Sequence, residues 1–159
     1  MKKNIWIKFI PFAMLVLALA GLADATYLTR AHYQGLALGC VAFSGCEEVT
    51  ASQYATIGNV PVALLGAFYY SAVFALILLY FIFERRADQK KKSFILSLAG
   101  KFTAIGFVVS LFFVYLQIFV IKAICTYCMA SAFTSTLLFL LGVVILRLQR
   151  NLAEEVRAT

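Results

Sequence analysis

Two cysteines, Cys125 and Cys128, stand in the stretch Cys-Thr-Tyr-Cys, where a long apolar run begins. A spacing of three residues puts both sulfurs on one face of a helix, close enough to form a disulfide. Unpaired backbone N–H groups and the helix dipole favour a thiolate at the start of a helix, and Cys-x-x-Cys pairs are typical of reactive thiols. The pair therefore predicts thiol–disulfide chemistry at the boundary between water and lipid.

A second pair, Cys40 and Cys46, lies earlier in the chain with five residues between its members. On a mobile loop, this pair can reach both a soluble thiol protein and the Cys-x-x-Cys pair. Thiol–disulfide exchange passes through mixed disulfides, so a relay needs such contacts in sequence. Three alternatives stay open: cysteines that only fill packed helices, a four-cysteine metal site for zinc, and a non-catalytic membrane subunit.

The composition places these thiols in a membrane protein. Of the 159 residues, 64% are hydrophobic, against about 45–50% in soluble domains, and the mean hydropathy is +0.93. Four apolar runs, at about 9–28, 61–83, 94–121 and 124–146, each reach the roughly 20 residues that a membrane-spanning helix needs. We therefore expect an all-α integral membrane protein, a four-transmembrane-helix bundle that forms a single membrane domain over residues 1–159.

The net charge of +7 indicates how the chain is oriented in the membrane. Most of the 14 basic residues lie before the first span, in the link 84–92 and after the fourth span. By the positive-inside rule, both termini are then cytoplasmic, and all four cysteines face the periplasmic or extracytoplasmic side of a cell inner or plasma membrane. This distribution argues against nucleic acid as a partner. The apolar start also resembles a signal peptide, but its length favours a retained first helix.

The long outer-side loop, about residues 29–60, holds Cys40 and Cys46. The stretch EEVTASQYATIG that follows is expected to form a short interfacial helix, with acidic residues in its first turn. Gly58 would end this helix, and Pro61 suits the first turn of span two. The loop is thus expected to lie along the membrane surface as a lid over the bundle.

The depth of the Cys-x-x-Cys pair indicates an electron acceptor. Cys128 lies one helical turn deeper toward lipid than Cys125. The lipid-soluble oxidant that suits such a thiol is a quinone. The pair is therefore predicted to pass electrons from a donor on the water side to a carrier dissolved in the bilayer.

Together these features resemble the vitamin K epoxide reductase family in its bacterial or archaeal form. The resemblance rests on four spans, a loop Cys-x5-Cys, Ser52 six residues after the second cysteine, and a Cys-x-Tyr-Cys that opens the last helix. The stretches VTASQYATIGNVPVALLG and YLTRAHY are also similar to the family. The disulfide bond protein B family shares the chemistry, but its tight pair comes in the first outer loop, whereas here the wide pair comes first.

The resemblance implies a route for electrons that ends in disulfide formation in exported proteins. Cys40 would accept electrons from a reduced thioredoxin-like partner, with Cys46 as its disulfide mate. Cys46 would exchange with Cys125, and Cys128 would face the quinone as a thiolate. Many bacterial members carry a fused thioredoxin-like domain, and this chain stops at Thr159, so a separate soluble partner on the outer side is implied. The quinone stays open among ubiquinone, menaquinone and a vitamin K form.

Further polar residues are candidates for the quinone site. Ser52 matches the family's loop serine, which is thought to support the reactive cysteines or the quinone by hydrogen bonding. Asn59 can hydrogen-bond either the loop backbone or a quinone carbonyl, and Tyr127 either anchors at the interface or lines the pocket. Asp24, near the outer end of span one, either snorkels to water or has a hydrogen-bonding role.

Overall fold

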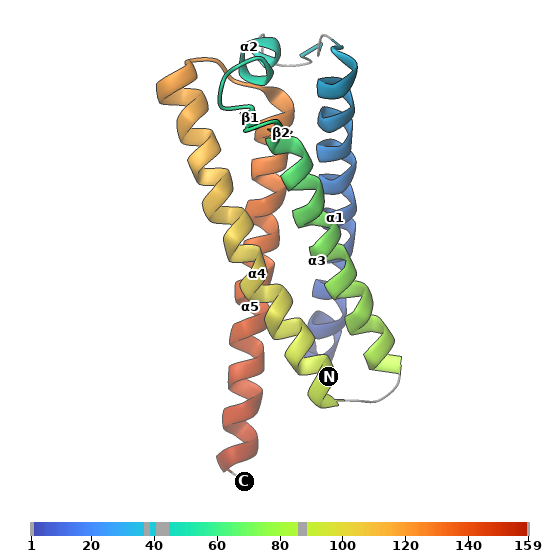
Figure 1. Cartoon of the computed structure of the whole chain (residues 1–159). Coiled ribbons are helices and arrows are strands. Elements are labelled where there is room, and N and C mark those ends of the chain that lie inside the picture. The colour runs from blue at the N-terminus through green and yellow to red at the C-terminus, as the bar shows by residue number, and fades with distance from the viewer. Residues whose placement is uncertain (1, 37–38, 41–44, 86–88, 159) are drawn as a thin grey trace.

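The computed structural model describes residues 2–36, 39–40, 45–85 and 89–158, and of residues 2–8, 89 and 152–158 it describes the backbone alone. In chain order the elements are α1 (Lys2–Gln34), α2 (Cys46–Thr50), β1 (Thr56–Ile57), β2 (Val60–Pro61), α3 (Val62–Arg85), α4 (Gln89–Tyr115), the π-helix η1 (Leu116–Ile121) and α5 (Thr126–Ala158). The four long helices form a bundle, and α2 with the two short strands covers the end opposite both termini (Figure 1).

The long helices confirm the predicted four-helix membrane bundle. The segments that are long and apolar enough to cross a membrane are Phe9–Gln34, Val62–Arg85, Lys90–Ile121 and Thr126–Asn151. The helices extend beyond the predicted spans: α1 continues past residue 28 to Gln34, and α5 continues past residue 146 to Ala158. A helix satisfies its own backbone hydrogen bonds in water as well as in lipid, so an apolar run marks only the part of it that lipid covers.

The outer loop differs from the expectation in its second half. Helix α2 ends at Thr50, and the chain after it forms an antiparallel hairpin in which Ile57 pairs with Val60. Gly58, at φ 64°, takes the first position of the two-residue turn, where the left-handed region favours glycine. Pro61 therefore ends a strand instead of standing in the first turn of span two, because α3 begins one residue later.

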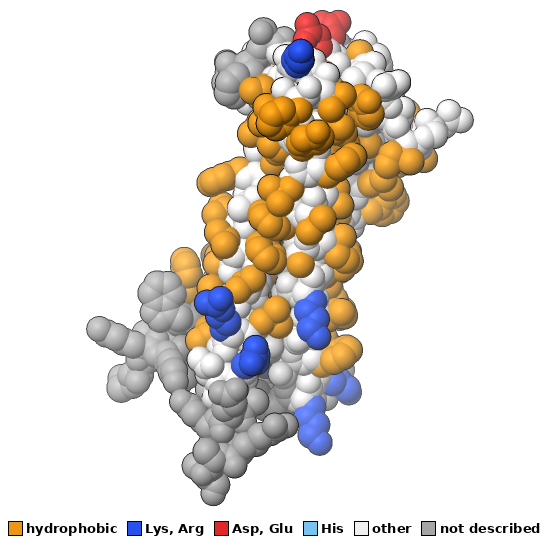
Figure 2. Space-filling model, turned by 90° about the vertical axis from the view of Figure 1, so that its left-hand side faces the viewer, with side chains coloured by type: hydrophobic (Ala, Val, Ile, Leu, Met, Phe, Trp, Pro, Cys, Tyr) orange, Lys and Arg blue, Asp and Glu red, His pale blue; other side chains and the backbone are white. Residues whose placement is uncertain are grey.

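The two ends of the bundle differ in charge (Figure 2). Lys and Arg side chains gather near the end that holds the termini, acidic side chains on this face lie at the opposite tip, and the surface between them is largely apolar. At the basic end, the Lys92 ammonium lies 2.9 Å from the Glu84 carboxylate, which joins α4 to α3. The observed arrangement suits a chain with both termini on the same side of a membrane.

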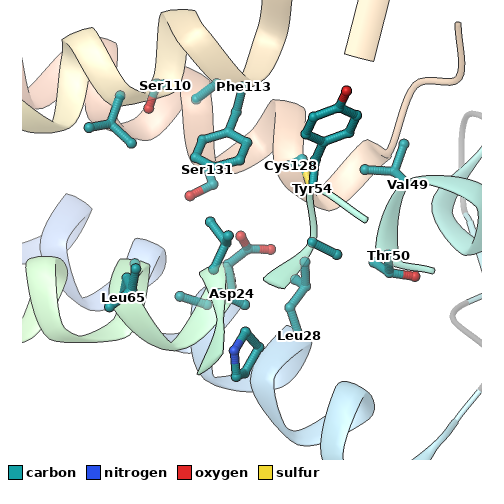
Figure 3. A pocket seen from close by; sticks show the side chains of 18 of the residues that line it. Asp24, Leu28, Val49, Thr50, Tyr54, Leu65, Ser110, Phe113, Cys128 and Ser131 are labelled. Atoms are coloured by element: carbon teal, nitrogen blue, oxygen red, sulfur yellow. The ribbon is translucent and has the colours of Figure 1, made fainter. Parts of the chain in front are cut away.

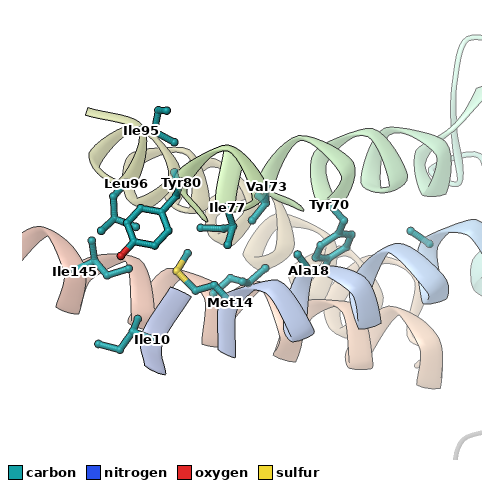
Figure 4. Close-up of a cluster of buried hydrophobic side chains, with 13 residues drawn as sticks. Ile10, Met14, Ala18, Tyr70, Val73, Ile77, Tyr80, Ile95, Leu96 and Ile145 are labelled. Carbon is teal, nitrogen blue, oxygen red and sulfur yellow. The ribbon is translucent and has the colours of Figure 1, made fainter. Parts of the chain in front are cut away.

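A buried core fills the part of the bundle nearer the termini (Figure 4). Tyr70, Tyr80, Met14 and Ile77 are among its largest fully buried side chains. Small residues let α4 and α5 approach closely here, as is common between membrane helices. A Cβ added to Gly142 would lie 3.0 Å from the carbonyl oxygen of Gly100 on the facing helix. Packing of backbone against backbone therefore sets the spacing of these two helices.

Hydroxyl groups join the helices above this core. The Tyr70 hydroxyl on α3 donates to the Ser131 carbonyl oxygen on α5 at 2.8 Å and lies 2.9 Å from the Ser131 hydroxyl. The Ser110 and Ser135 hydroxyls form a hydrogen bond between α4 and α5. Such bonds fix the helices at the level where the buried core gives way to a cavity.

The Gly142 contact gives a stability prediction. Gly142→Ala should lower the free energy of unfolding by about 1–3 kcal/mol, because the new methyl group meets backbone that cannot move aside. Gly66→Ala is the matched control, since its Cβ would lie 3.6 Å from the Ala25 methyl, an ordinary contact. Thermal unfolding of both variants in detergent measures the difference. Equal midpoints for the two variants would contradict this account of the α4–α5 contact.

Candidate functional site

A cavity of about 1110 Å³ lies between the helices beneath α2 (Figure 3). Every long helix contributes to its lining, and so do α2 and the loop after it. The lining side chains are mostly apolar, with a few polar groups among them. Those labelled in the figure are Asp24, Leu28, Val49, Thr50, Tyr54, Leu65, Ser110, Phe113, Cys128 and Ser131. An apolar cavity with few convergent polar groups is the usual form of a small-molecule site.

The four cysteines meet at one buried cluster in two redox states, and Cys128 also lines the cavity. Cys40 and Cys46 form a disulfide with 5.7 Å between their Cα atoms, which is the pairing that the family resemblance implied. Cys125 and Cys128 are free thiols. Cys46 and Cys125 are both 0% exposed and belong to one buried cluster. The inner sulfur of the loop disulfide therefore sits in the same packed cluster as the first cysteine of the Cys-x-x-Cys pair.

Gly45 allows the outer loop to contact the backbone just before α5. A Cβ at Gly45 would lie 2.8 Å from the backbone nitrogen of Ile124 and 2.9 Å from the Ala123 methyl. No other residue type fits at such a distance without moving backbone. Gly45 is also the N-cap residue of α2, so the close contact directly precedes Cys46. The glycine thus fixes the position of Cys46 next to the segment that carries Cys125.

Cys125 caps the N-terminus of α5. The sequence had suggested that it lies within the first turn of the helix. The helix begins at Thr126, and the Met129 N–H donates to the Cys125 carbonyl oxygen at 3.0 Å. A hydrogen bond from the Cys128 thiol lowers the pKa of Cys125 to about 7, aided by the backbone N–H groups of Cys128 and Tyr127 and opposed by burial. Donors at a helix N-terminus stabilise a thiolate in this way.

The π-helix η1, which was not predicted from the sequence, positions this cap. The Gln117 side chain on η1 is buried, and its Oε1 accepts the Cys125 N–H at 2.9 Å. The chain then reverses at Lys122, which has φ 58°, a left-handed value that is uncommon for a residue other than glycine. π-Helical turns often mark functional sites. A glutamine within an apolar span was the one available signal for this contact.

The structure brings two of the predicted residues to the cavity. Cys128 faces it from the first turn of α5, whereas Cys125 is not among the lining residues. Ser52 also lines it, and its hydroxyl donates to the Val49 carbonyl oxygen at 2.7 Å. In this state Ser52 therefore holds the end of α2 in place.

Two other predicted residues lie away from the cavity. Asn59 is exposed in the turn between β1 and β2. The Tyr127 ring packs on Tyr27 of α1, with 5.2 Å between ring centroids. Neither residue lines the cavity, so their assignment to a quinone is not supported by the geometry. Each lies close in sequence to a residue that does line the cavity, but its side chain points elsewhere.

Asp24 is half-buried and faces the cavity. Its side chain lines the cavity from α1, and its Oδ2 is buried without a hydrogen-bond partner. Figure 3 shows the Asp24, Ser131 and Cys128 side chains directed into the same space. This placement favours a hydrogen-bonding role for Asp24 over snorkelling.

The alternative of a metal site receives no support from the described part of the chain. Within residues 9–36, 39–40, 45–85 and 90–151, whose side chains the structure describes, no group of three or more His, Cys, Asp or Glu is placed to hold a metal ion. Two of the four cysteines are already joined to each other. A site with four thiolate ligands would require this disulfide to be broken.

The chain matches the model of the vitamin K epoxide reductase family over residues 12–143. The match covers more than half of the 159 residues and contains Asp24 and all four cysteines. No curated protein matches the chain.

The contact at Gly45 gives a kinetic prediction. In a Cys40→Ser, Cys128→Ser background, oxidation should trap a Cys46–Cys125 mixed disulfide, which mass spectrometry of peptides can count. Adding Gly45→Ala should slow its formation roughly tenfold or more, because overpacking of about 1–3 kcal/mol disfavours the close approach. Gly39→Ala is the matched control, with open space around the added methyl. Unchanged trapping with Gly45→Ala would show that the contact does not position Cys46.

The cap at Cys125 gives a pH prediction. In the fully reduced protein, thiolate absorbance in the ultraviolet should rise with a midpoint near pH 7, because the pKa of Cys125 is lowered to about 7. Cys128→Ala removes the main donor, so the pKa of Cys125 should rise and less thiolate should remain at neutral pH. The absorbance step should be absent from Cys125→Ser. A step that persists in Cys125→Ser would assign the thiolate to another residue.

Proposed function

Because this chain belongs to the vitamin K epoxide reductase family, we propose that it transfers electrons from thiols outside the membrane to a quinone in the bilayer. The family makes the chain a membrane thiol–disulfide oxidoreductase. One observation supports the proposed transfer of electrons to a quinone. Cys128 lines a large apolar cavity, while its partner Cys125 shares a buried cluster with Cys46 of the loop disulfide. The Cys-x-x-Cys pair thus lies between the loop disulfide and the cavity.

The accessibility of the sulfurs supports an order for the exchanges. Cys40 is partly exposed, whereas Cys46 is fully buried. A thiolate of a soluble thioredoxin-like partner attacks Cys40, and the partner's second thiol completes reduction of the loop pair. Cys46 then attacks Cys125 of an oxidised Cys125–Cys128 pair, and Cys40 resolves the mixed disulfide. The product is the observed state, with the loop pair oxidised and the inner pair reduced.

The cavity suits a quinone in size, polarity and access. Its volume of about 1110 Å³ lies slightly above the usual range of ligand pockets, about 300–1,000 Å³. Some of its lining residues are also exposed on the outside of the bundle, including Phe68 of α3 at 64% and Ile105 of α4 at 55%. A lipid-soluble carrier can therefore reach the cavity from the bilayer. A bound quinone supplies an acceptor for two electrons and two protons.

The direction of transfer follows from the orientation proposed for the chain. The basic end with both termini would face the cytoplasm, and the cysteine end would face the extracytoplasmic space, an oxidising compartment. Cys40 would there receive electrons from a thioredoxin-like protein that has oxidised exported proteins. The physiological outcome would be disulfide formation in those proteins.

An anaerobic assay tests the proposal. Purified protein with a reduced thioredoxin-like donor should reduce quinone, followed by quinone absorbance, and a variant with all four cysteines changed to serine should not. Cys128→Ser should abolish quinone reduction while Cys40–Cys46 still reacts with the donor, because only the thiol facing the cavity is lost. Quinone turnover retained in Cys128→Ser would refute the role of Cys128. Equal turnover in the all-serine variant would refute the thiol route altogether.

A further inference from the structure

Asp24 is a carboxyl group in an unusual place. It lies on the membrane-spanning helix α1 and lines the apolar cavity together with Cys128. Its Oδ2 is buried and has no hydrogen-bond partner. Buried polar atoms in native proteins are nearly always hydrogen-bonded, so such an exception calls for an explanation. Ionisable groups within membrane spans are costly and usually serve proton relays or ligand sites.

The chemistry in the cavity creates a need for such a group. Reduction of a quinone to a quinol consumes two electrons and two protons. Formation of the Cys125–Cys128 disulfide releases two electrons, but the sulfurs bring two protons only if both are thiols. Because the pKa of Cys125 is lowered to about 7, its thiolate is well populated at neutral pH, and in that form the pair brings a single proton, on Cys128. A second proton donor must then reach the same cavity.

We propose that Asp24 is this second proton donor, an inference that rests on the proposed quinone reductase function. Asp24 donates its proton to a quinone oxygen as the Cys125–Cys128 disulfide forms, and Cys128 gives up the other proton. One S–S bond forms, the S–H bond of Cys128 and the O–H bond of Asp24 break, and two O–H bonds form on the quinol. The negative charge of the Cys125 thiolate ends on the Asp24 carboxylate, which then takes up a proton from the outer side.

Three other titratable groups that line the cavity, on Tyr70, Glu47 and His32, are less suited to this role. The Tyr70 hydroxyl already donates to the Ser131 carbonyl. Glu47 is exposed on α2. His32 is exposed two turns further along α1, roughly 12 Å from Asp24 at the rise of an α-helix. Asp24 is the one carboxyl group among the described lining residues that lies on a membrane-spanning helix.

The groups around Asp24 determine how stable its carboxylate form would be. The titratable groups that interact with it electrostatically are Tyr70 of α3, Cys128 and Tyr127 of α5, and Cys125 at the α5 cap. All four become negative or stay neutral on titration, so none provides a cation for an Asp24 carboxylate. The carboxylate formed in the step is therefore unstable in place, which favours its reprotonation before the next turnover.

The test compares Asp24→Asn with the wild-type protein in the anaerobic quinone assay. The amide keeps the shape and can still hydrogen-bond a quinone, but it cannot release a proton. We expect kcat to fall about 100-fold or more, the typical contribution of a general acid. The quinone dissociation constant and the rate of Cys46–Cys125 exchange should stay unchanged. Thr26→Val, on the exposed side of α1 where Thr26 bonds only its own helix, is the matched control.

Two further measurements separate proton donation from a structural role. Formate should restore turnover to Asp24→Ala, because a small acid fits the vacated space, and Asp24→Glu should keep much of the activity. In infrared spectra, quinone binding should shift a carboxyl band that is absent from Asp24→Asn. Full turnover in Asp24→Asn, or a loss that formate does not rescue and that accompanies weaker quinone binding, would overturn the inference. A wild-type protein that reduces no quinone would instead refute the proposed function.

Discussion

The backbone contact between Gly45 and the segment Ala123–Ile124 determines how the loop meets the membrane bundle. It places Cys46 in the same buried cluster as Cys125, at the point where α5 begins. A larger residue at Gly45 would separate the two chains where thiol exchange needs them in contact. The route proposed for electrons therefore depends on a glycine, a residue with no chemistry of its own.

The two cysteines at the start of α5 have different positions and different roles. Cys125 lies at the cap, where the Gln117 side chain binds its N–H and the Cys128 thiol and nearby N–H groups lower its pKa. Cys128 lies one turn further and faces the cavity that Asp24 also lines. A thiolate directed to the loop and a thiol directed to the cavity can thus exchange with different reactants. The spacing of the Cys-x-x-Cys pair makes this possible on one helix turn.

Much of this arrangement could be predicted from the sequence, because hydrophobicity and cysteine spacing are strong signals. Apolar runs indicated the four helices, and two cysteine pairs indicated the redox chemistry. The cap at Cys125 was missed because it depends on η1 and on Gln117, contacts set by the tertiary fold. The positions of Asn59 and Tyr127 away from the cavity lining could not be predicted for a related reason. Proximity in sequence does not say which way a side chain points at the end of a hairpin or helix.

The order in which the two disulfides form tests the central claim most directly. Fully reduced protein is mixed with quinone, the remaining thiols are alkylated at successive times, and mass spectrometry identifies the disulfides. The account predicts that Cys125–Cys128 forms first and that Cys40–Cys46 follows, because only Cys128 faces the cavity. Formation of Cys40–Cys46 before Cys125–Cys128 would contradict it, since the loop pair would then be oxidised without the pair that should connect it to the quinone.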